Sequence, residues 1–505
     1  MEKLFYTPNN CNNCFNLWMA YPACEAFALS SLGYMWLSKL AEEADFVNSE
    51  RVYTDSKTTR TKASEVNAIA FSMSFDFDFM GVFEFLEKYD IPLRVKDRKE
   101  FSPLVFAGGP VITTNPEPYK VFFDFFIIGD GEEVFLKVLK ILSKENNKSD
   151  TLKELSSLAG VYVPNISKNV TKVTEELNNV IYTPILSDKS YFKDTFIIEV
   201  ARGCMNRCAF CTASYLNLPF RNYKYDKIIE IIDNALKETP KIALLGAQIS
   251  AHPHFLDIMR YLEAKIDAGL NIDLGISSLR TDSITPELIK ILVKGGQKTS
   301  TIAIEAASER LRKFINKNLK EEQILNAVKI SRENGLQGLK IYSMIGIPNE
   351  TMEDIEEFVR LAKLIKSQNK GFHITFSFST FVPKPQTPLQ WAKREDNKSL
   401  EKKQKYLEKE LAKLGIGTKF SSAKWDYWQT VLSRGDTSLG EFLLEVYRQG
   451  GKIGAYKSAL KKYNIDITKS INGYEFEDSL PWDYIDSYPG KKLLHQEYQR
   501  LNKRI

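Results

Sequence analysis

Short apolar runs alternate with longer amphipathic stretches along most of the chain. Apolar runs rich in β-branched residues are typical of buried parallel strands, whereas apolar residues at three- and four-residue intervals indicate helices packed on a sheet. Between residues 191 and 392 this alternation predicts six strand–helix units. The expected strands are 195–201, 241–246, 271–276, 300–305, 339–345 and 373–381. Such a repeat predicts an α/β domain built as a partial barrel, a full barrel or an open sheet.

The first third of the chain shows the same alternation in shorter elements. The expected strands are 66–72, 103–109 and 122–128, and the expected helices are 75–89 and 132–143. Glycines follow the second and third of these strands, where they allow a backbone to approach a ligand closely. We therefore predict a Rossmann-like, doubly wound parallel sheet over residues 1–145.

Two further segments differ in composition from these α/β regions. Residues 146–190 are rich in Asn, Lys and Ser, which predicts a linker, with a short hairpin at 160–163. Residues 393–505 begin with a charged amphipathic helix at 399–414 and later contain aromatic clusters. We therefore predict a mostly helical carboxyl-terminal segment after the central domain.

Composition narrows the classes of protein. The 505 residues include 69 basic and 64 acidic side chains, a balance that argues against a nucleic-acid partner without excluding a small RNA. No run of about 20 apolar residues occurs, so we expect no membrane-spanning helix. The first residues lack the apolar core of a signal peptide, and the six cysteines are expected to be reduced thiols or metal ligands of a cytoplasmic protein.

Three cysteines are concentrated in one loop after the first strand of the central domain. Cys204, Cys208 and Cys211 have the spacing C-x3-C-x2-C, and no further Cys or His follows until His252. Thiolates select iron–sulfur clusters or zinc, and a structural zinc site needs a fourth ligand nearby. The pattern therefore favours an iron–sulfur cluster with one iron left open, over zinc, a disulfide or inert thiols.

This motif, with Phe210 before the third cysteine, resembles the signature of radical S-adenosylmethionine (radical SAM) enzymes. The resemblance implies a partial (β/α)6 barrel of TIM type and a 4Fe-4S cluster on Cys204, Cys208 and Cys211. It also implies that SAM binds the open iron through its amino and carboxylate groups.

Residues at later strand ends extend the resemblance. Ser250 lies in the loop where relatives hold the SAM amino group, and Arg280 is a candidate for the SAM carboxylate or for a surface ion pair. Glu305, at the end of an apolar strand, needs a cation or hydroxyl partner, which SAM would supply. Gly346 and Pro348 belong to an element whose backbone lies against SAM adenine in relatives.

Other polar side chains near these strand ends have two interpretations. His252 and His254 are expected either to face the site or to lie at a solvated helix start. Lys384 is expected to be a solvated lysine at the barrel rim, with projection into the site as the alternative.

The amino-terminal glycine elements resemble the radical SAM group with a cobalamin-binding-like domain. They are Gly108-Gly109 and Gly129-Asp-Gly131. That domain type supplies a histidine to cobalt, whereas the first histidine of this chain is His252. The sequence therefore excludes a histidine-ligated cobalamin and leaves two alternatives, cobalamin without a protein histidine and a domain that has lost cobalamin.

Three more cysteines lie near the amino terminus. Cys11 and Cys14 form a C-x2-C pair, and Cys24 follows. A zinc site or a second cluster would need a further ligand that the surrounding sequence does not offer. We therefore predict free structural thiols at these positions.

The sequence as a whole predicts a radical SAM enzyme that generates a 5′-deoxyadenosyl radical, with cobalamin-dependent methylation as one reaction class. Isomerisation, lyase chemistry and sulfur insertion are the other classes. The resemblance implies an electron donor such as flavodoxin or ferredoxin, and it does not name the substrate, which is either a small molecule or a macromolecule. The competing hypothesis is a non-enzymatic iron–sulfur protein for electron transfer or sensing.

Overall fold

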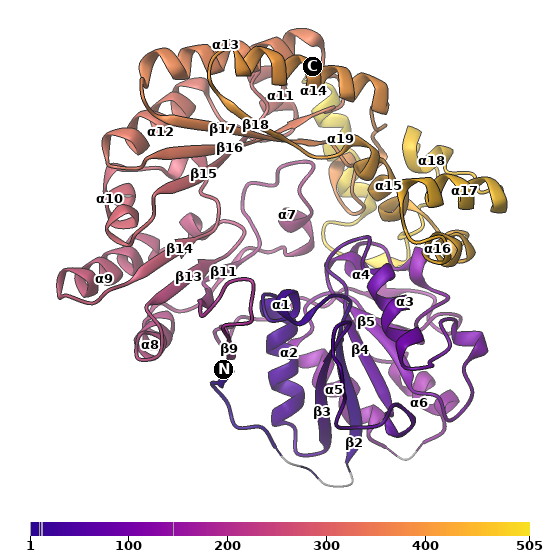
Figure 1. The fold of residues 1–505 in the computed structure, drawn as a ribbon. Coiled ribbons are helices and arrows are strands. Elements are labelled where there is room, and N and C mark those ends of the chain that lie inside the picture. Colours follow the sequence, from indigo (N-terminus) through magenta and orange to yellow (C-terminus); the bar gives the residue numbers. More distant parts are fainter. Residues whose placement is uncertain (1, 10, 12–13, 145, 505) are drawn as a thin grey trace.

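The computed structural model describes residues 2–9, 11, 14–144 and 146–504. Its amino-terminal part is built on a six-stranded sheet of order β3-β2-β4-β5-β6-β7, in which only β7 runs antiparallel to its neighbour. The strands are β2 (Phe15–Tyr21), β3 (Val47–Tyr53), β4 (Ala68–Ser72), β5 (Leu104–Gly108), β6 (Phe125–Ile127) and β7 (Val161–Tyr162). The predicted Rossmann-like sheet is therefore confirmed (Figure 1).

Alternate residues of β2 show why the sheet needs helices on both faces. Leu17 and Met19 pack with one group of helices, whereas Trp18 and Ala20 pack on the opposite side. The first face is covered by α2 (Leu32–Glu43) and α5 (Glu132–Leu142), and the second by α3 (Phe79–Lys88) and α4 (Pro110–Thr114). A strand buried on both faces reads as a continuous apolar run, as β2 and β4 do.

The segment 146–190, expected to be a linker, instead contributes to three sheets. It contains α6 (Lys148–Leu155) and then β7, which pairs antiparallel with β6 where a local hairpin was expected. Further along, β8 (Val170–Thr171) pairs with β19 (Ile485–Asp486), and β9 (Ile185–Leu186) pairs with β1 (Lys3–Leu4). The polar composition conceals these short strands because only one or two apolar residues of each are buried.

The central domain is a partial barrel of parallel strands. They are β10 (Phe196–Glu199), β13 (Lys241–Leu245), β14 (Asp273–Ile276), β15 (Thr299–Glu305), β16 (Gly338–Ile345), β17 (His373–Thr380) and β18 (Gly417–Phe420). A single parallel bridge, Leu279 to Ile302, connects its three-stranded and four-stranded parts. All six predicted strands are present, and β18 is an additional strand from the segment expected to be mostly helical.

Helices cover the outer side of this barrel (Figure 1). They are α8 (Tyr225–Leu236), α9 (Phe255–Asp267), α10 (Pro286–Lys294), α11 (Glu309–Phe314), α12 (Glu321–Glu333), α13 (Met352–Gln368) and α14 (Asn397–Ala412). Each carries apolar residues on the face turned to the strands, which is the pattern that the sequence showed. The predicted helix at 399–414 corresponds to α14.

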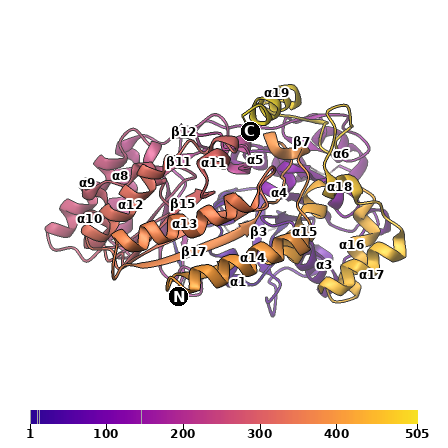
Figure 2. The ribbon, with the colours of Figure 1, turned by 90° about the horizontal axis from the view of Figure 1, so that it is seen from above.

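The carboxyl-terminal helices pack against the first domain as well as the barrel (Figures 1 and 2). They are α15 (Ala423–Arg434), α16 (Leu439–Arg448), α17 (Ile453–Tyr463), α18 (Thr468–Asn472) and α19 (Lys491–Asn502). Trp428, Phe442 and Trp482 belong to the same apolar core as Trp18 of the first sheet. In the described chain, no helix is both long enough and apolar enough to cross a bilayer.

A buried carboxylate joins these three parts of the chain. Asp76, between β4 and α3, is only 4% exposed. Its Oδ2 lies 2.7 Å from Lys384 Nζ and accepts a hydrogen bond from Gln429 Nε2 at 2.9 Å, while its Oδ1 accepts one from Ser433 at 2.8 Å. Lys384 is therefore neither a solvated rim lysine nor a group of the cysteine site, because its ammonium neutralises Asp76.

We predict that Asp76→Ala destabilises the protein by about 3–5 kcal/mol, because it leaves the Lys384 ammonium without its buried partner. Urea unfolding followed by circular dichroism measures the effect. The matched control is Asp97→Ala, which removes an exposed ion pair to Arg94 and costs below about 1 kcal/mol. Equal midpoints for the two variants would contradict the prediction.

Candidate functional site

The three clustered cysteines lie on a loop at the carboxyl end of the first barrel strand. The loop follows β10 and β11 (Ala201–Arg202) and ends at α7 (Thr212–Leu216). Gly203 has φ 85°, and a Cβ there would lie 2.3 Å from the carbonyl oxygen of Asn217, so only glycine fits this turn. Cys204 and Cys208 are buried, and Cys211 is partly exposed. Two of the three thiols are therefore inaccessible to solvent, and the third is partly accessible.

Polar neighbours surround the first two thiols. Cys204 Sγ lies 3.2 Å from Gln248 Oε1, and the same oxygen accepts a hydrogen bond from Asn206 Nδ2 at 2.6 Å. Burial raises the pKa of Cys208 to about 12, although the positive charge of Lys317 acts in the opposite direction. Metal binding requires the thiolate form. The positive charge of a bound metal would therefore have to offset the cost of burying a negative charge at Cys208.

A single-ion metal site is absent from the described residues, since no three Cys, His, Asp or Glu side chains are close enough to share one ion. In a cubane cluster each cysteine binds a different iron, so its sulfurs stand farther apart than the ligands of a single ion.

Glu305 ends β15 beside the cysteine loop. Its φ is 65°, after a register shift between Ala303 and Glu305 that turns the chain at the barrel mouth. Its Oε1 lies 3.2 Å from Lys317 Nζ, and both side chains are mostly buried. Burial opposes the charge of Lys317, yet neighbouring Glu305 raises the pKa of Lys317 above its ordinary value.

Lys317 is the site residue that sequence reasoning missed. We expected a SAM group to be the cationic or hydroxyl partner of Glu305, but the protein itself provides that partner. The sequence contained only an indirect signal for Lys317. A carboxylate on an apolar strand needs a cation, but Lys317 and Lys320 both follow α11, and the sequence does not distinguish between them.

The remaining side chains expected at the site have local partners. Arg280 Nε lies 2.7 Å from Asp282 Oδ1, and its Nη2 donates to the Lys317 carbonyl oxygen at 3.4 Å, so the guanidinium lies beside the Glu305–Lys317 pair. His252 is buried, with Nε2 2.9 Å from the Tyr223 carbonyl oxygen, and burial lowers its pKa. His254 pairs with Asp257 on the exposed side. Neither histidine therefore contacts the three thiols.

Ser250 follows β13 and the Gly346–Pro348 loop follows β16, so the two belong to different parts of the partial barrel. Ser250 is in the short turn Ile249–Ala251, directly after Gln248, which contacts Cys204. Gly346 follows β16 with φ 77°, and its N–H donates to Glu350 Oε2 at 2.7 Å. Lys403 in turn pairs with Glu350 at 2.8 Å. Burial raises the pKa of Glu350 to about 7.

An apolar cluster brings these strand-end loops together. It contains Ala209 of the cysteine loop, Ala306 after β15 and Ile347 of the loop after β16, all almost fully buried. Phe210, the aromatic residue of the cysteine motif, packs against the same cluster. The structure therefore brings together three loops that follow three different strands.

A cavity of about 420 Å³ lies at the carboxyl edge of the first sheet. Residues after β4, β5 and β6 line it together with the start of α2, and the barrel contributes Glu199, Arg202 and Leu245. The glycines of its wall are Gly33, Gly108, Gly109, Gly129 and Gly131. Open parallel sheets bind their ligands at this edge, and the volume is that of a ligand pocket.

Arg202 connects the cavity to the cysteine loop. Its guanidinium lies 3.1 Å from Asp130, 2.7 Å from Glu132 and 2.8 Å from Glu199. Arg221 makes a second contact with Asp130 at 2.7 Å. Because Arg202 is two residues before Cys204, this buried charge network fixes the first thiol relative to the cavity.

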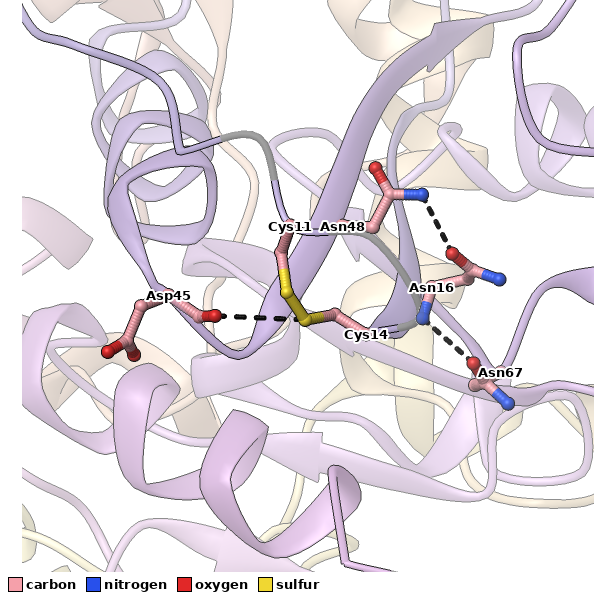
Figure 3. Close-up of a disulfide and its surroundings, with 6 residues drawn as sticks. All are labelled: Cys11, Cys14, Asn16, Asp45, Asn48 and Asn67. Atoms are coloured by element: carbon pink, nitrogen blue, oxygen red, sulfur yellow. Dashed lines mark hydrogen bonds between the residues drawn. A yellow bond between two sulfur atoms is a disulfide. The ribbon is translucent and has the colours of Figure 1, made fainter.

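The amino-terminal cysteines depart from the expectation of free thiols. Cys11 and Cys14 form a disulfide with their Cα atoms 5.8 Å apart, and Cys14 Sγ lies 3.7 Å from the Asp45 carbonyl oxygen (Figure 3). Cys24 is free. With only two residues between them, the two thiols are close enough to form a bond. The expectation of free thiols rested on the redox compartment and did not include this proximity.

Two family models match separate parts of the chain. Residues 36–164 match the description "Radical SAM proteins, N-terminal", and residues 198–362 match "Radical SAM superfamily". These regions coincide with most of the first sheet and most of the partial barrel.

Individual relatives agree with both matches. An uncharacterised protein of Methanocaldococcus jannaschii is 34% identical over 402 residues, covering 77% of this chain and 83% of that protein. An uncharacterised methyltransferase of Pyrococcus horikoshii is 28% identical over 329 residues, covering 59% and 67%. The solved structure of OxsB, a cobalamin-dependent radical SAM enzyme with aqua-cobalamin and SAM bound, is similar in fold, with TM-score 0.56, 13% identity and coverage of 97% and 79%. The chain therefore belongs to the radical SAM superfamily and is an enzyme of that type.

Proposed function

We propose that Cys204, Cys208 and Cys211 hold the 4Fe-4S cluster of this radical SAM enzyme. The observation that carries the proposal is their placement on one packed loop at the barrel mouth, where the apolar cluster and Gln248 hold it. Among the described residues, Cys24 is the one free cysteine outside this loop, and three cysteine ligands suit a cluster that leaves one iron for SAM. The bound cluster supplies one electron that cleaves SAM to methionine and a 5′-deoxyadenosyl radical.

The neighbouring strand ends are proposed to hold SAM. Lys317 is proposed to donate to the SAM carboxylate, and Arg280, which lies beside Lys317 and pairs with Asp282, is the second candidate for this role. Glu305 then turns to the ammonium or the ribose hydroxyls. The backbone of Gly346 and Pro348, held by the Glu350–Lys403 pair, supports the adenine, and Ser250 borders the amino group.

The cavity beside Arg202 is proposed to bind cobalamin, and methyl transfer is the proposed reaction class. At Gly33 the wall is open, since a Cβ there would meet no atom within 4 Å, whereas Gly109 and Gly129 lie close against backbone atoms of Met73 and Val173. No histidine precedes His252, so the protein offers cobalt no imidazole in this domain. The similarity in fold to OxsB and the methyltransferase relative support this choice over a domain that has lost cobalamin.

The electron donor and the compartment complete the proposal. A reduced flavodoxin or ferredoxin is proposed to supply the electron, in the cytoplasm, where low-potential iron–sulfur proteins meet their reductants. The competing hypothesis of a non-enzymatic iron–sulfur carrier has lost its support, because both the barrel and the amino-terminal region match radical SAM models.

We predict that replacing any one of Cys204, Cys208 and Cys211 by Ala removes the visible absorbance of the cluster after anaerobic reconstitution with iron and sulfide. Each thiolate holds its own iron, so two cannot retain the cubane. Cys24→Ala is the control and should keep full absorbance. If all three single variants retained the cluster, other residues would have to be its ligands.

We predict that the reconstituted wild-type protein, reduced in the presence of SAM, forms methionine and 5′-deoxyadenosine in equal amounts. Lys317→Ala should lower the rate at subsaturating SAM by about tenfold, equivalent to about 1.4 kcal/mol, because the SAM carboxylate loses a buried cation. Liquid chromatography with mass detection measures both products. Lys313→Ala, an exposed lysine of α11, is the control. If the cluster is intact and no 5′-deoxyadenosine forms, the proposed reductive cleavage of SAM is wrong.

We predict that Gly33→Phe weakens retention of hydroxocobalamin by about tenfold, equivalent to about 1.4 kcal/mol, because the ring enters the cavity. Co-elution on gel filtration, with the cobalamin absorbance as readout, measures this. Gly454→Phe is a matched control, since both glycines are the second residue of a helix and face open space. If wild-type protein retains no cobalamin, the proposed cofactor is wrong.

A further inference from the structure

The inner face of β15–β18 is a polar surface that the proposed SAM site does not use. In register, Tyr342 of β16 lies beside Ser377 of β17, which lies beside Lys419 of β18. One row below, Thr301, Lys340 and Thr375 are neighbours in the same way. These six residues define the inner face named here.

Strand alternation shows which way this face points. The intervening residues Ile302, Ile341 and Phe376 are fully buried, and Phe358 of α13 contacts the ring of Phe376. The helices therefore cover the opposite side of the sheet, and the inner face turns to the barrel interior.

This interior is open where a closed barrel would be filled. Barrel interiors are normally packed with layers of branched apolar side chains. Here Tyr342, on a strand with neighbours on both sides, is 39% exposed, and Lys419 is exposed. Hydroxyl groups and ammonium groups occupy the positions where Val, Ile and Leu would stabilise a closed core, so the face is available to a ligand.

The two lysines of the inner face differ from most buried lysines in their surroundings. Lys340 Nζ lies 3.3 Å from the Tyr342 hydroxyl and 4.6 Å from its ring centre. Among the residues that the structure describes, no Asp or Glu oxygen pairs with Lys340 or Lys419. The carboxylate at the end of the same sheet, Glu305, is already paired with Lys317.

This lack of a carboxylate contrasts with three other lysines inside the molecule, whereas the buried Lys172 donates to the Leu216 carbonyl oxygen. Lys317, Lys384 and Lys403 each face a carboxylate within 3.2 Å. A solvated lysine on a convex surface needs no partner, but two like charges on a concave wall concentrate a positive field. Among the described residues, no carboxylate balances the positive charge of the inner face. An anionic ligand would balance it.

We propose that the inner face of β15–β18 binds an anionic group of the substrate, a carboxylate or a phosphate. Lys340 and Lys419 provide the charge, and the hydroxyls of Tyr342 and Ser377 between them donate hydrogen bonds to the oxygens. The face continues along β15 to Glu305 at the barrel mouth, so the rest of the substrate extends toward the cysteine loop. The inference rests on the proposed function only in taking the barrel interior as the substrate site.

The test is titration of the reconstituted protein with inorganic phosphate and, separately, with ¹³C-malonate. Line widths of the ³¹P and ¹³C resonances report binding in the absence of SAM and of turnover. The Lys340→Ala/Lys419→Ala double variant should bind the preferred anion at least about tenfold more weakly, and the corresponding double Arg variant should retain binding. The tighter of the two anions identifies the substrate group as phosphate or carboxylate.

The matched control is Lys363→Ala, an exposed lysine of α13 on the outer side of the same sheet. It should leave both titrations unchanged. Equal binding of both anions by wild type and the double Ala variant, with circular dichroism showing both folded, would overturn the proposal. Failure of wild-type protein to cleave SAM would refute the proposed function alone, because the anion titration requires no turnover.

Discussion

The site depends on the packing of three loops against one another at the mouth of the barrel. Ala209, Ala306 and Ile347 are nearly inaccessible and come from three different strand ends. Small apolar residues at such a contact let backbones approach closely, so the thiols, Glu305 and the Gly346 loop share one small region. A larger side chain at Ala209 or Ala306 would separate the loops before it touched any ligand.

Two buried networks of ion pairs connect this region to the rest of the molecule. Arg202 sits among Asp130, Glu132 and Glu199 between the cavity and the cysteine loop. Asp76 joins the first sheet to Lys384 and α15. Breaking a buried pair leaves one uncompensated charge, so such contacts fix the relative position of domains even where they add little net stability.

The sheets of the two α/β parts therefore act together. The carboxyl edge of the first sheet borders the cavity, and the barrel supplies Glu199, Arg202 and Leu245 to its wall. A ligand in the cavity would lie beside the residues that precede the cysteines.

Features with a local signal could be predicted from the amino-acid sequence. Strands of continuous apolar residues, the cysteine spacing and the glycines after β5 and β6 are readable because each reflects a short-range rule, and the resemblance that they carry identified the family. Lys317 as the partner of Glu305, the engagement of Arg280 by Asp282, the Asp76–Lys384 pair, the strand β18 and the Cys11–Cys14 bond required the tertiary structure. Each depends on which distant groups meet, and composition and periodicity carry no information about that. The open inner face of β15–β18 is the same kind of case, because only the packing of α13 behind the sheet reveals that Lys340 and Tyr342 point into the barrel.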